Sequence, residues 1–166
     1  MLEYVIEGYL MENDYSGYDI KQNMESVKFF NASYGSIYPA LKRMEADGLI
    51  SSREIVEGGK YKRVYSIKKK GREQFLSWLE KSPNIIKSDN EHIIKTFFYK
   101  YLPEEKVKES VAGFIKSTNS LVRRMEVLES LLGKNLDSYE RAALAFQTDQ
   151  YRFIRDWYRR FLDKKY

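Results

Sequence analysis

The chain of 166 residues contains no cysteine, which excludes disulfides, thiolate catalysis and cysteine-based zinc sites. Histidine is almost as scarce, because His92 is the only one. The nearby carboxylates Asp89 and Glu91 do not complete a metal-ligand set, and no nucleophile motif accompanies the histidine. We therefore expect no metal, no cofactor and no enzymatic activity.

Long apolar segments are also missing. The chain has no apolar run of about 18 residues, so we expect no membrane span and no membrane partner. The first residues, Met1-Leu2-Glu3-Tyr4, lack the basic region that opens a secretory signal. With the absence of cysteine, these features predict a cytoplasmic protein. The length allows one good hydrophobic core, or a small domain joined to an oligomerisation element.

Charge is distributed unevenly along a chain whose net charge is +5. Residues 1–32 carry two Lys/Arg against six Asp/Glu, a net charge of −4. Residues 33–72 carry ten Lys/Arg against four Asp/Glu, a net charge of +6. Segregated charge of this kind indicates a surface that faces a polyanion.

Helical spacing and capping residues predict two helices at the start of the chain. Apolar residues at helical spacing indicate a first helix that begins at Leu2 and ends near Asn13. Asp14 or Ser16 can cap a second helix, because the side-chain oxygen of either accepts a hydrogen bond from a free backbone N–H.

A third helix is expected between Ser33, its N-cap, and Gly48, which suits the position after a helix. Pro39 lies inside this segment. It fits a first turn only if the helix begins near Gly35 or Ser36, and it should kink a helix that begins at Ser33. The sequence leaves both starts open.

A basic hairpin follows. Residues 49–56 and 61–67 are predicted strands, and Gly58-Gly59 supplies the positive φ of the turn between them. Val64 and Ile67 break the alternation, which leaves a bulge or an early strand end open. The order of helix, strand, basic turn and strand is typical of a winged helix-turn-helix, which presents its third helix and its wing to DNA.

The clearest break in the chain is Ser82-Pro83-Asn84. We place the boundary there, between a winged helix-turn-helix DNA-binding domain at residues 1–82 and an α-helical dimerisation domain at residues 83–166. The second domain should contain a short helix, a long helix that opens at Pro103 and a last helix that Ser138 can cap. The fold class is therefore mostly α with a small β-hairpin.

Two features of the second domain predict a homodimer. The long helix repeats apolar residues in alternating steps of four and three, as a coiled-coil seam does, and the last helix is apolar on two sides. A second copy of the chain is the simplest partner for the extra side. The predicted dimer contacts are Val111, Phe114, Leu121, Met125, Leu128, Phe146, Phe153, Trp157 and Phe161.

Polar and basic residues on and around the third helix and the wing form the predicted DNA-binding surface. Their side chains can reach base edges or phosphates, although an ordinary solvated surface would have a similar composition. Basic residues in the wing are suited to the DNA backbone or the minor groove. The set comprises Tyr18, Lys21, Ser33, Tyr34, Ser36, Tyr38, Lys42, Arg43, Lys60, Lys62 and Arg63.

Several of these motifs together resemble the PadR family of bacterial transcriptional regulators. They are Ser16-Gly17-Tyr18-Asp19-Ile20, the run at 35–45, Asp47-Gly48-Leu49-Ile50, and Val64-Tyr65-Ser66-Ile67 with Lys70-Gly71-Arg72. The first 80 or so residues are similar to the family's DNA-binding domain, and the remainder resembles the module of its virulence-activator-like branch. Lys69 departs from the family pattern, which often has threonine there. The resemblance implies a homodimer that binds a pseudo-palindromic operator and often represses nearby genes in response to a small molecule.

The favoured function is thus that of a transcriptional repressor that binds double-stranded DNA in a sequence-specific manner. The rival is a winged-helix protein-interaction module with a coiled-coil partner. The aromatic residues, 14 Tyr, 9 Phe and 2 Trp, could line a pocket for a small aromatic effector, but core and interface packing is the simpler explanation for most. Trp78, Phe97 and Phe98, near the Pro83 break, are the candidates, with packing between domains as the alternative.

Overall fold

The computed structural model describes residues 1–26, 32–85, 90–132 and 135–163. The chain forms two compact units. The first, here the winged unit, comprises Met1–Lys81 and Asn90–Leu102, and the second, the C-terminal unit, comprises Ser82–Asp89 and Pro103–Tyr166. The winged unit is thus made of two separate segments of the chain.

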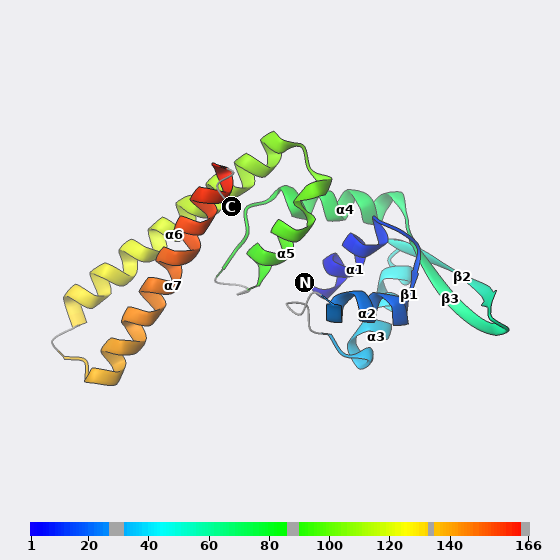
Figure 1. The fold of residues 1–166 in the computed structure, drawn as a ribbon, viewed down its shortest axis with the longest axis horizontal. Helices are drawn as coiled ribbons and strands as arrows, with labels where there is room; N and C mark the ends of the chain where they lie inside the picture. The colour runs from blue at the N-terminus through cyan, green and yellow to red at the C-terminus, as the bar shows by residue number, and fades with distance from the viewer. Residues whose placement is uncertain (27–31, 86–89, 133–134, 164–166) are drawn as a thin grey trace. The chain divides into compact units, whose positions relative to one another are not determined.

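Helices and a small sheet build the winged unit (Figure 1). The described elements confirm the mostly helical class and the winged helix-turn-helix order. In chain order they are α1 (Leu2–Leu10), β1 (Tyr15–Ser16), α2 (Gly17–Ser26), α3 (Tyr34–Ala46), β2 (Ile50–Glu57), β3 (Lys60–Ile67), α4 (Lys69–Glu80), α5 (Glu91–Phe98) and the 3-10 helix η1 (Tyr99–Tyr101).

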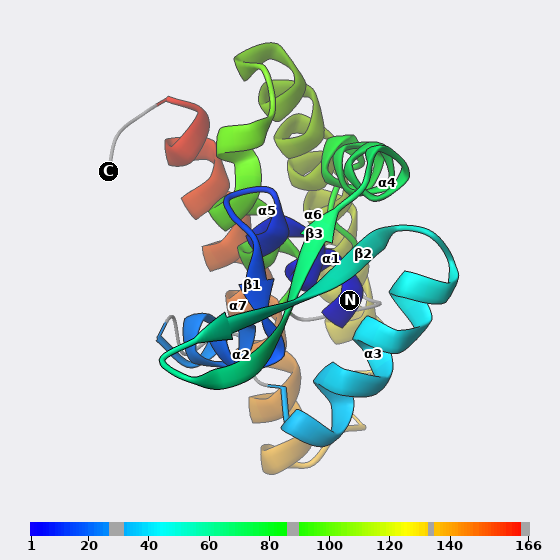
Figure 2. The same ribbon diagram turned by 90° about the vertical axis from the view of Figure 1, so that its right-hand side faces the viewer.

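The sheet is antiparallel, with β3 between β1 and β2. Figure 2 shows β2 and β3 as a long hairpin with β1 beside β3. Gly58 and Gly59 both have positive φ, 58° and 77°, as a two-residue hairpin turn with matching twist requires. The register runs unbroken from the pair Ile50–Ile67 to the pair Glu57–Lys60, so the bulge that the sequence left open does not form.

Helix α3 begins at Tyr34, with Ser33 as its N-cap. Pro39 therefore lies inside the helix, where it has no N–H to donate to the carbonyl of Gly35. Ile37, Ala40, Leu41 and Met44 are fully buried along one face of α3. The opposite face is left exposed, and this places the polar residues of α3 at the surface.

The core of the winged unit is rich in aromatic rings from α1, α4 and α5. Phe98 lies edge-on to Phe75 at 5.5 Å and to Phe97 at 5.0 Å between ring centroids. Trp78 stacks on Tyr4 at 4.5 Å. These contacts all lie within one unit, so Trp78, Phe97 and Phe98 pack inside the winged unit, whereas the alternative from the sequence placed that packing between domains.

A buried lysine connects α5 to the end of α4. Lys95 is fully buried, and its Nζ donates hydrogen bonds to the carbonyls of Trp78 at 2.7 Å and Lys81 at 2.6 Å. Nζ also lies 3.3 Å from Glu91 Oε1. Burial lowers the pKa of Lys95, while the neighbouring Glu91 opposes that change. The cation therefore caps carbonyls at the C-terminal end of α4, where the helix dipole favours positive charge.

Two long antiparallel helices, α6 (Glu104–Leu132) and α7 (Ser138–Leu162), make up most of the C-terminal unit (Figure 1). Asp137, rather than the predicted Ser138, is the N-cap of α7. Its Oδ1 accepts from the N–H groups of Tyr139 and Glu140, and Glu140 Oε2 accepts from the N–H of Asp137. This reciprocal capping box favours Asp137 as the start.

One side of each long helix forms the core of the C-terminal unit. Phe114 of α6 meets Tyr158 of α7 edge-on at 5.0 Å, and Val111 and Ile154 are buried with them. Val111, Phe114 and Leu121 thus pack inside one copy of the chain. Phe146 and Phe153, on the other side of α7, are 72% and 64% exposed. None of the described helices has the length and apolar composition that crossing a membrane requires.

Candidate nucleic-acid interface

Three exposed tyrosines form a row across α2 and α3. The ring centroids of Tyr18 and Tyr34 lie 6.4 Å apart, as do those of Tyr34 and Tyr38, and both pairs are nearly parallel. All three side chains are exposed. The row brings together three of the residues predicted to bind DNA, and it offers flat faces and hydroxyl groups to a ligand at the surface.

Serines and a lysine extend this surface along α3. Ser36 Oγ donates to the carbonyl of Ser33 at 2.8 Å, within the first turn. Their side chains lie at the N-terminal end of α3, where backbone N–H groups and the helix dipole favour anions. Lys42 lies farther along the exposed side and forms no ion pair among the described side chains.

The other two helical cations are already paired. Lys21 Nζ lies 2.5 Å from Glu25 Oε1 and 5.9 Å from the centroid of the Tyr34 ring. Arg43 Nη2 lies 3.1 Å from Glu3 Oε1 of α1. The Arg43–Glu3 pair lies at the surface, where such contacts are weak. The Lys21 side chain, in contrast, is only 12% exposed.

In the wing, Lys62 bridges two carboxylates. Its Nζ lies 2.9 Å from Glu57 Oε2 and 3.1 Å from Asp19 Oδ2. Hydrogen bonds to Glu57 and Asp19 raise the pKa of Lys62. Although burial opposes the change, hydrogen bonds from Ser16 and Lys62 lower the pKa of Asp19. The contact joins β3 to the first turn of α2.

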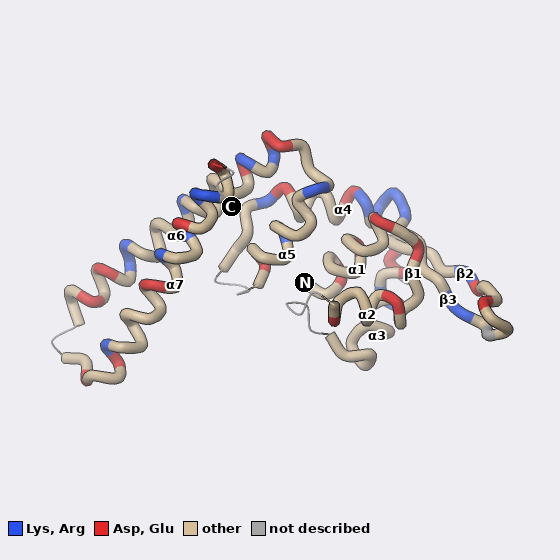
Figure 3. Tube along the Cα trace, in the orientation of Figure 1, with Lys and Arg blue, Asp and Glu red and all other residues tan. Residues whose placement is uncertain are grey.

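Arg63 turns toward α3 rather than away from the protein. Its Nη2 donates to Glu45 Oε2 at 2.8 Å and its Nε donates to Ser52 Oγ at 2.9 Å. Figure 3 shows blue and red segments close together along β2 and β3. Lys60 begins β3, but its side chain lies outside the part of the structure that is described. The wing is therefore not a purely basic projection.

A surface groove runs between the wing, α2 and α3. The predicted DNA-binding set omitted five of its residues, which are Tyr61 and Tyr65 of β3, Ser16, Gly17 and Glu57. Tyr61 is 85% exposed, which its strand alternation could have indicated. The groove is lined by Ser16, Gly17, Tyr18, Tyr38, Glu57, Tyr61, Lys62, Arg63 and Tyr65.

Within the described ranges, His, Asp and Glu side chains nowhere gather in a group of three that could hold a metal ion. His92 is buried in α5, and Asp89 lies outside the described residues.

A helix-turn-helix followed by a two-stranded wing defines the class: the winged unit is a winged helix-turn-helix module. Residues 8–77 match the family model described as "Transcriptional regulator PadR-like family". The matched residues lie within the winged unit, so the similarity to PadR-like transcriptional regulators concerns that unit.

Individual relatives are similar over different lengths. The negative transcriptional regulator PadR of Bacillus subtilis is 30% identical over 115 residues, which cover 66% of this chain and 62% of that protein. A crystal structure of B. subtilis PadR with operator DNA aligns over 99% of each chain, at 21% identity and a TM-score of 0.49. Another, with p-coumaric acid, aligns over 99% of this chain and 94% of that one, at 19% identity and a TM-score of 0.43.

Proposed function

We propose that the protein is a sequence-specific, DNA-binding transcriptional repressor that acts as a homodimer on a pseudo-palindromic operator. The observation that carries the proposal is the exposed side of α2 and α3, with its tyrosine row and Lys42, beside a hairpin wing in a segment that matches the PadR-like family model. The B. subtilis relative, described as a negative transcriptional regulator, supports the repressor sense.

The chemistry of the surface supports a division of roles. The N-terminal part of α3, with Ser33, Tyr34, Ser36 and Tyr38, enters the major groove, where hydroxyl groups and aromatic rings meet base edges and thymine methyls. Lys42 contacts a phosphate. The exposed Tyr61 places the wing against the backbone or minor groove.

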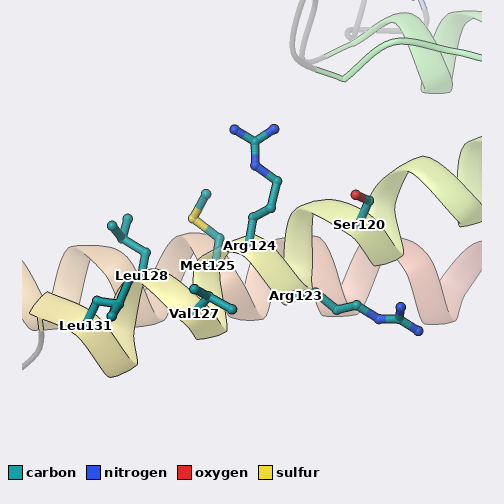
Figure 4. A pocket seen from close by; sticks show the side chains of 7 residues that line it. All are labelled: Ser120, Arg123, Arg124, Met125, Val127, Leu128 and Leu131. Atoms are coloured by element: carbon teal, nitrogen blue, oxygen red, sulfur yellow. The ribbon is translucent and has the colours of Figure 1, made fainter.

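Exposed apolar side chains on the C-terminal unit support a homodimer. Val127 and Leu131 of α6 are 58% and 71% exposed, and they line a shallow pocket with Met125, Leu128 and nearby polar residues (Figure 4). Phe146 and Phe153 leave a similar apolar stripe on α7. Isolated exposed apolar residues are common, but stripes along two helices favour burial against a partner. A second copy supplies matching stripes through two-fold symmetry.

Titration of labelled duplexes from the region upstream of the protein's own gene tests the DNA-binding proposal. We expect fluorescence anisotropy to show tight binding to one duplex and much weaker binding to a scrambled control. Lys42→Gln should lower the slope of log affinity against log salt by about 0.9 in magnitude for each phosphate that the side chain no longer neutralises. Equal affinity for both duplexes would favour non-specific binding, and no binding to any duplex would favour the protein-interaction module.

Light scattering on the full chain tests the homodimer. The double variant Phe146→Ser, Phe153→Ser should shift the dimer toward the monomer without loss of helical content. Val56→Ser is a matched control, because Val56 is an apolar side chain with 64% exposure but lies in β2 of the winged unit. A wild-type monomer at micromolar concentration would contradict the proposal. A small aromatic effector stays a prediction, to be tested by its effect on operator affinity.

A further inference from the structure

The guanidinium of Arg63 lies in a closed set of contacts from three elements. Besides its bonds to Glu45 of α3 and Ser52 of β2, it lies 5.7 Å from the centroid of the Tyr65 ring in its own strand β3. Ser52 Oγ in turn donates to Glu45 Oε1 at 2.6 Å. Each oxygen of Glu45 therefore accepts a hydrogen bond from the wing. We call Glu45, Ser52 and Arg63 the wing anchor.

Arg63 pairs with Glu45 of α3 rather than with its neighbour on the adjacent strand. In the strand register, Glu54 lies opposite Arg63. Glu54 is exposed, yet the guanidinium bonds to Glu45, which comes from a different element. An isolated surface pair contributes little, but this one includes a carboxylate with two donors and a guanidinium bonded through two nitrogens. The planar guanidinium therefore constrains the orientation of the contact in addition to supplying a positive charge.

Lys62 repeats the arrangement on the other face of the wing. It links β3 to Asp19, whose Oδ2 also accepts from the N–H and Oγ of Ser16, the residue just before α2. Adjacent residues of one strand point to opposite faces, so Lys62 and Arg63 attach the hairpin to two different helices. Together they resist rotation of the wing about its own length.

We propose that Arg63 is a positioning residue, which holds the wing at a fixed angle to α3 through Glu45 and Ser52, and that Lys62 does the same toward α2 through Asp19. The inference rests on the proposed DNA binding and makes it more specific. It replaces the view of these two cations as direct phosphate contacts. The wing reaches DNA through its tip, and the anchor sets where that tip lies relative to the bases that α3 contacts.

Neutralising Glu45 distinguishes a positioning role from a purely electrostatic one, because the two roles predict opposite changes in DNA affinity. If electrostatics alone governs binding, Glu45→Gln removes a negative charge beside a polyanion and strengthens DNA binding. If Glu45 positions the wing, the same substitution weakens binding to the preferred duplex, by about three- to tenfold for a partly exposed pair. Glu54→Gln is the matched control, since it removes the same charge from the wing without touching the anchor. It should leave affinity unchanged or slightly higher.

Arg63 variants supply the second comparison. Arg63→Lys keeps the charge but loses the planar pair of bonds, so a positioning role predicts that it weakens specific binding nearly as much as Arg63→Gln. Neither should alter the salt slope, whereas removal of a cation that neutralises a phosphate lowers its magnitude by about 0.9. Full DNA affinity of Arg63→Lys together with a lower slope for Arg63→Gln would overturn the proposal.

Amide hydrogen exchange in the DNA-free protein tests the wing anchor independently of the DNA-binding proposal. In Glu45→Gln and Arg63→Gln we expect faster exchange of the β2 and β3 amides, with α6 and α7 unchanged. Unchanged exchange in the hairpin would refute the wing anchor even if the wild type binds DNA. Faster exchange with no binding of any duplex would retain the anchor and reject the DNA-binding function.

Discussion

Glu7 should make the winged unit less stable as the pH rises. Its side chain is fully buried in α1, where Oε1 accepts a hydrogen bond from Gln74 Nε2 at 3.1 Å. Its other oxygen, Oε2, meets no hydrogen-bond partner among the described residues. Burial, reinforced by the charge of Glu3, raises the pKa of Glu7 from 4.5 to about 8. At pH 7 the folded chain therefore holds this carboxyl mostly protonated.

The sign and size of the effect follow from linkage. The pKa is higher in the folded than in the unfolded chain, so the folded state binds the proton more tightly. The corresponding stability is fully present below pH 4.5 and is lost as the pH rises through about 8. At 1.36 kcal/mol per pKa unit the whole loss is about 5 kcal/mol, of which about 2.5 kcal/mol falls between pH 6 and pH 9.

Glu7→Gln tests this estimate, because glutamine still accepts from Gln74 and cannot ionise. We expect its free energy of unfolding, minus that of the wild type, to grow by about 2.5 kcal/mol from pH 6 to pH 9. Urea denaturation in a Trp157→Phe background reports the winged unit, since Trp78 is then the only tryptophan. Glu54→Gln, which removes an exposed carboxylate, should show no such growth. A difference for Glu7→Gln that stays constant with pH would refute the reasoning.

Three further substitutions test the packing. Gly71→Ala should destabilise by about 2–4 kcal/mol in urea denaturation, because its Cβ would lie 2.3 Å from the backbone oxygen of Leu49. Lys95→Met should cost about 2–4 kcal/mol, since the Trp78 and Lys81 carbonyls lose a buried charged donor. Asp137→Ala should cost about 1 kcal/mol through loss of the α7 cap, measured by thermal melting followed by circular dichroism.

Local signals predicted much of this fold correctly. The hairpin turn at Gly58-Gly59 and the helix between Ser33 and Gly48 depend on residues close together in sequence. Such local patterns predict secondary structure without knowledge of contacts between distant parts of the chain. The two-residue strand β1 was not predicted, because it is too short to show alternation and forms only by pairing with β3.

Contacts between distant parts of the chain could not be predicted in the same way. Sequence reasoning grouped Lys62 and Arg63 as free wing cations, since nothing local showed that Asp19 and Glu45 would meet them. It also assigned α5 to the second domain, whereas the buried rings of Phe98 and Phe75 place this helix in the winged unit. The functional boundary between DNA binding and dimerisation stays a prediction.

Folding also changes the meaning of the charge segregation in the sequence. Three acidic residues of the first 32, Glu3, Asp14 and Asp19, pair with Arg43, Arg53 and Lys62 of the basic segment. The two segments are thus interleaved in space, and the net charge of +6 over residues 33–72 overstates the positive field that DNA would meet. Counterion release should therefore reflect Lys42 and other unpaired cations more than the number of basic residues. Shape, through the tyrosine row and the anchored wing, must then supply more of the specificity than charge does.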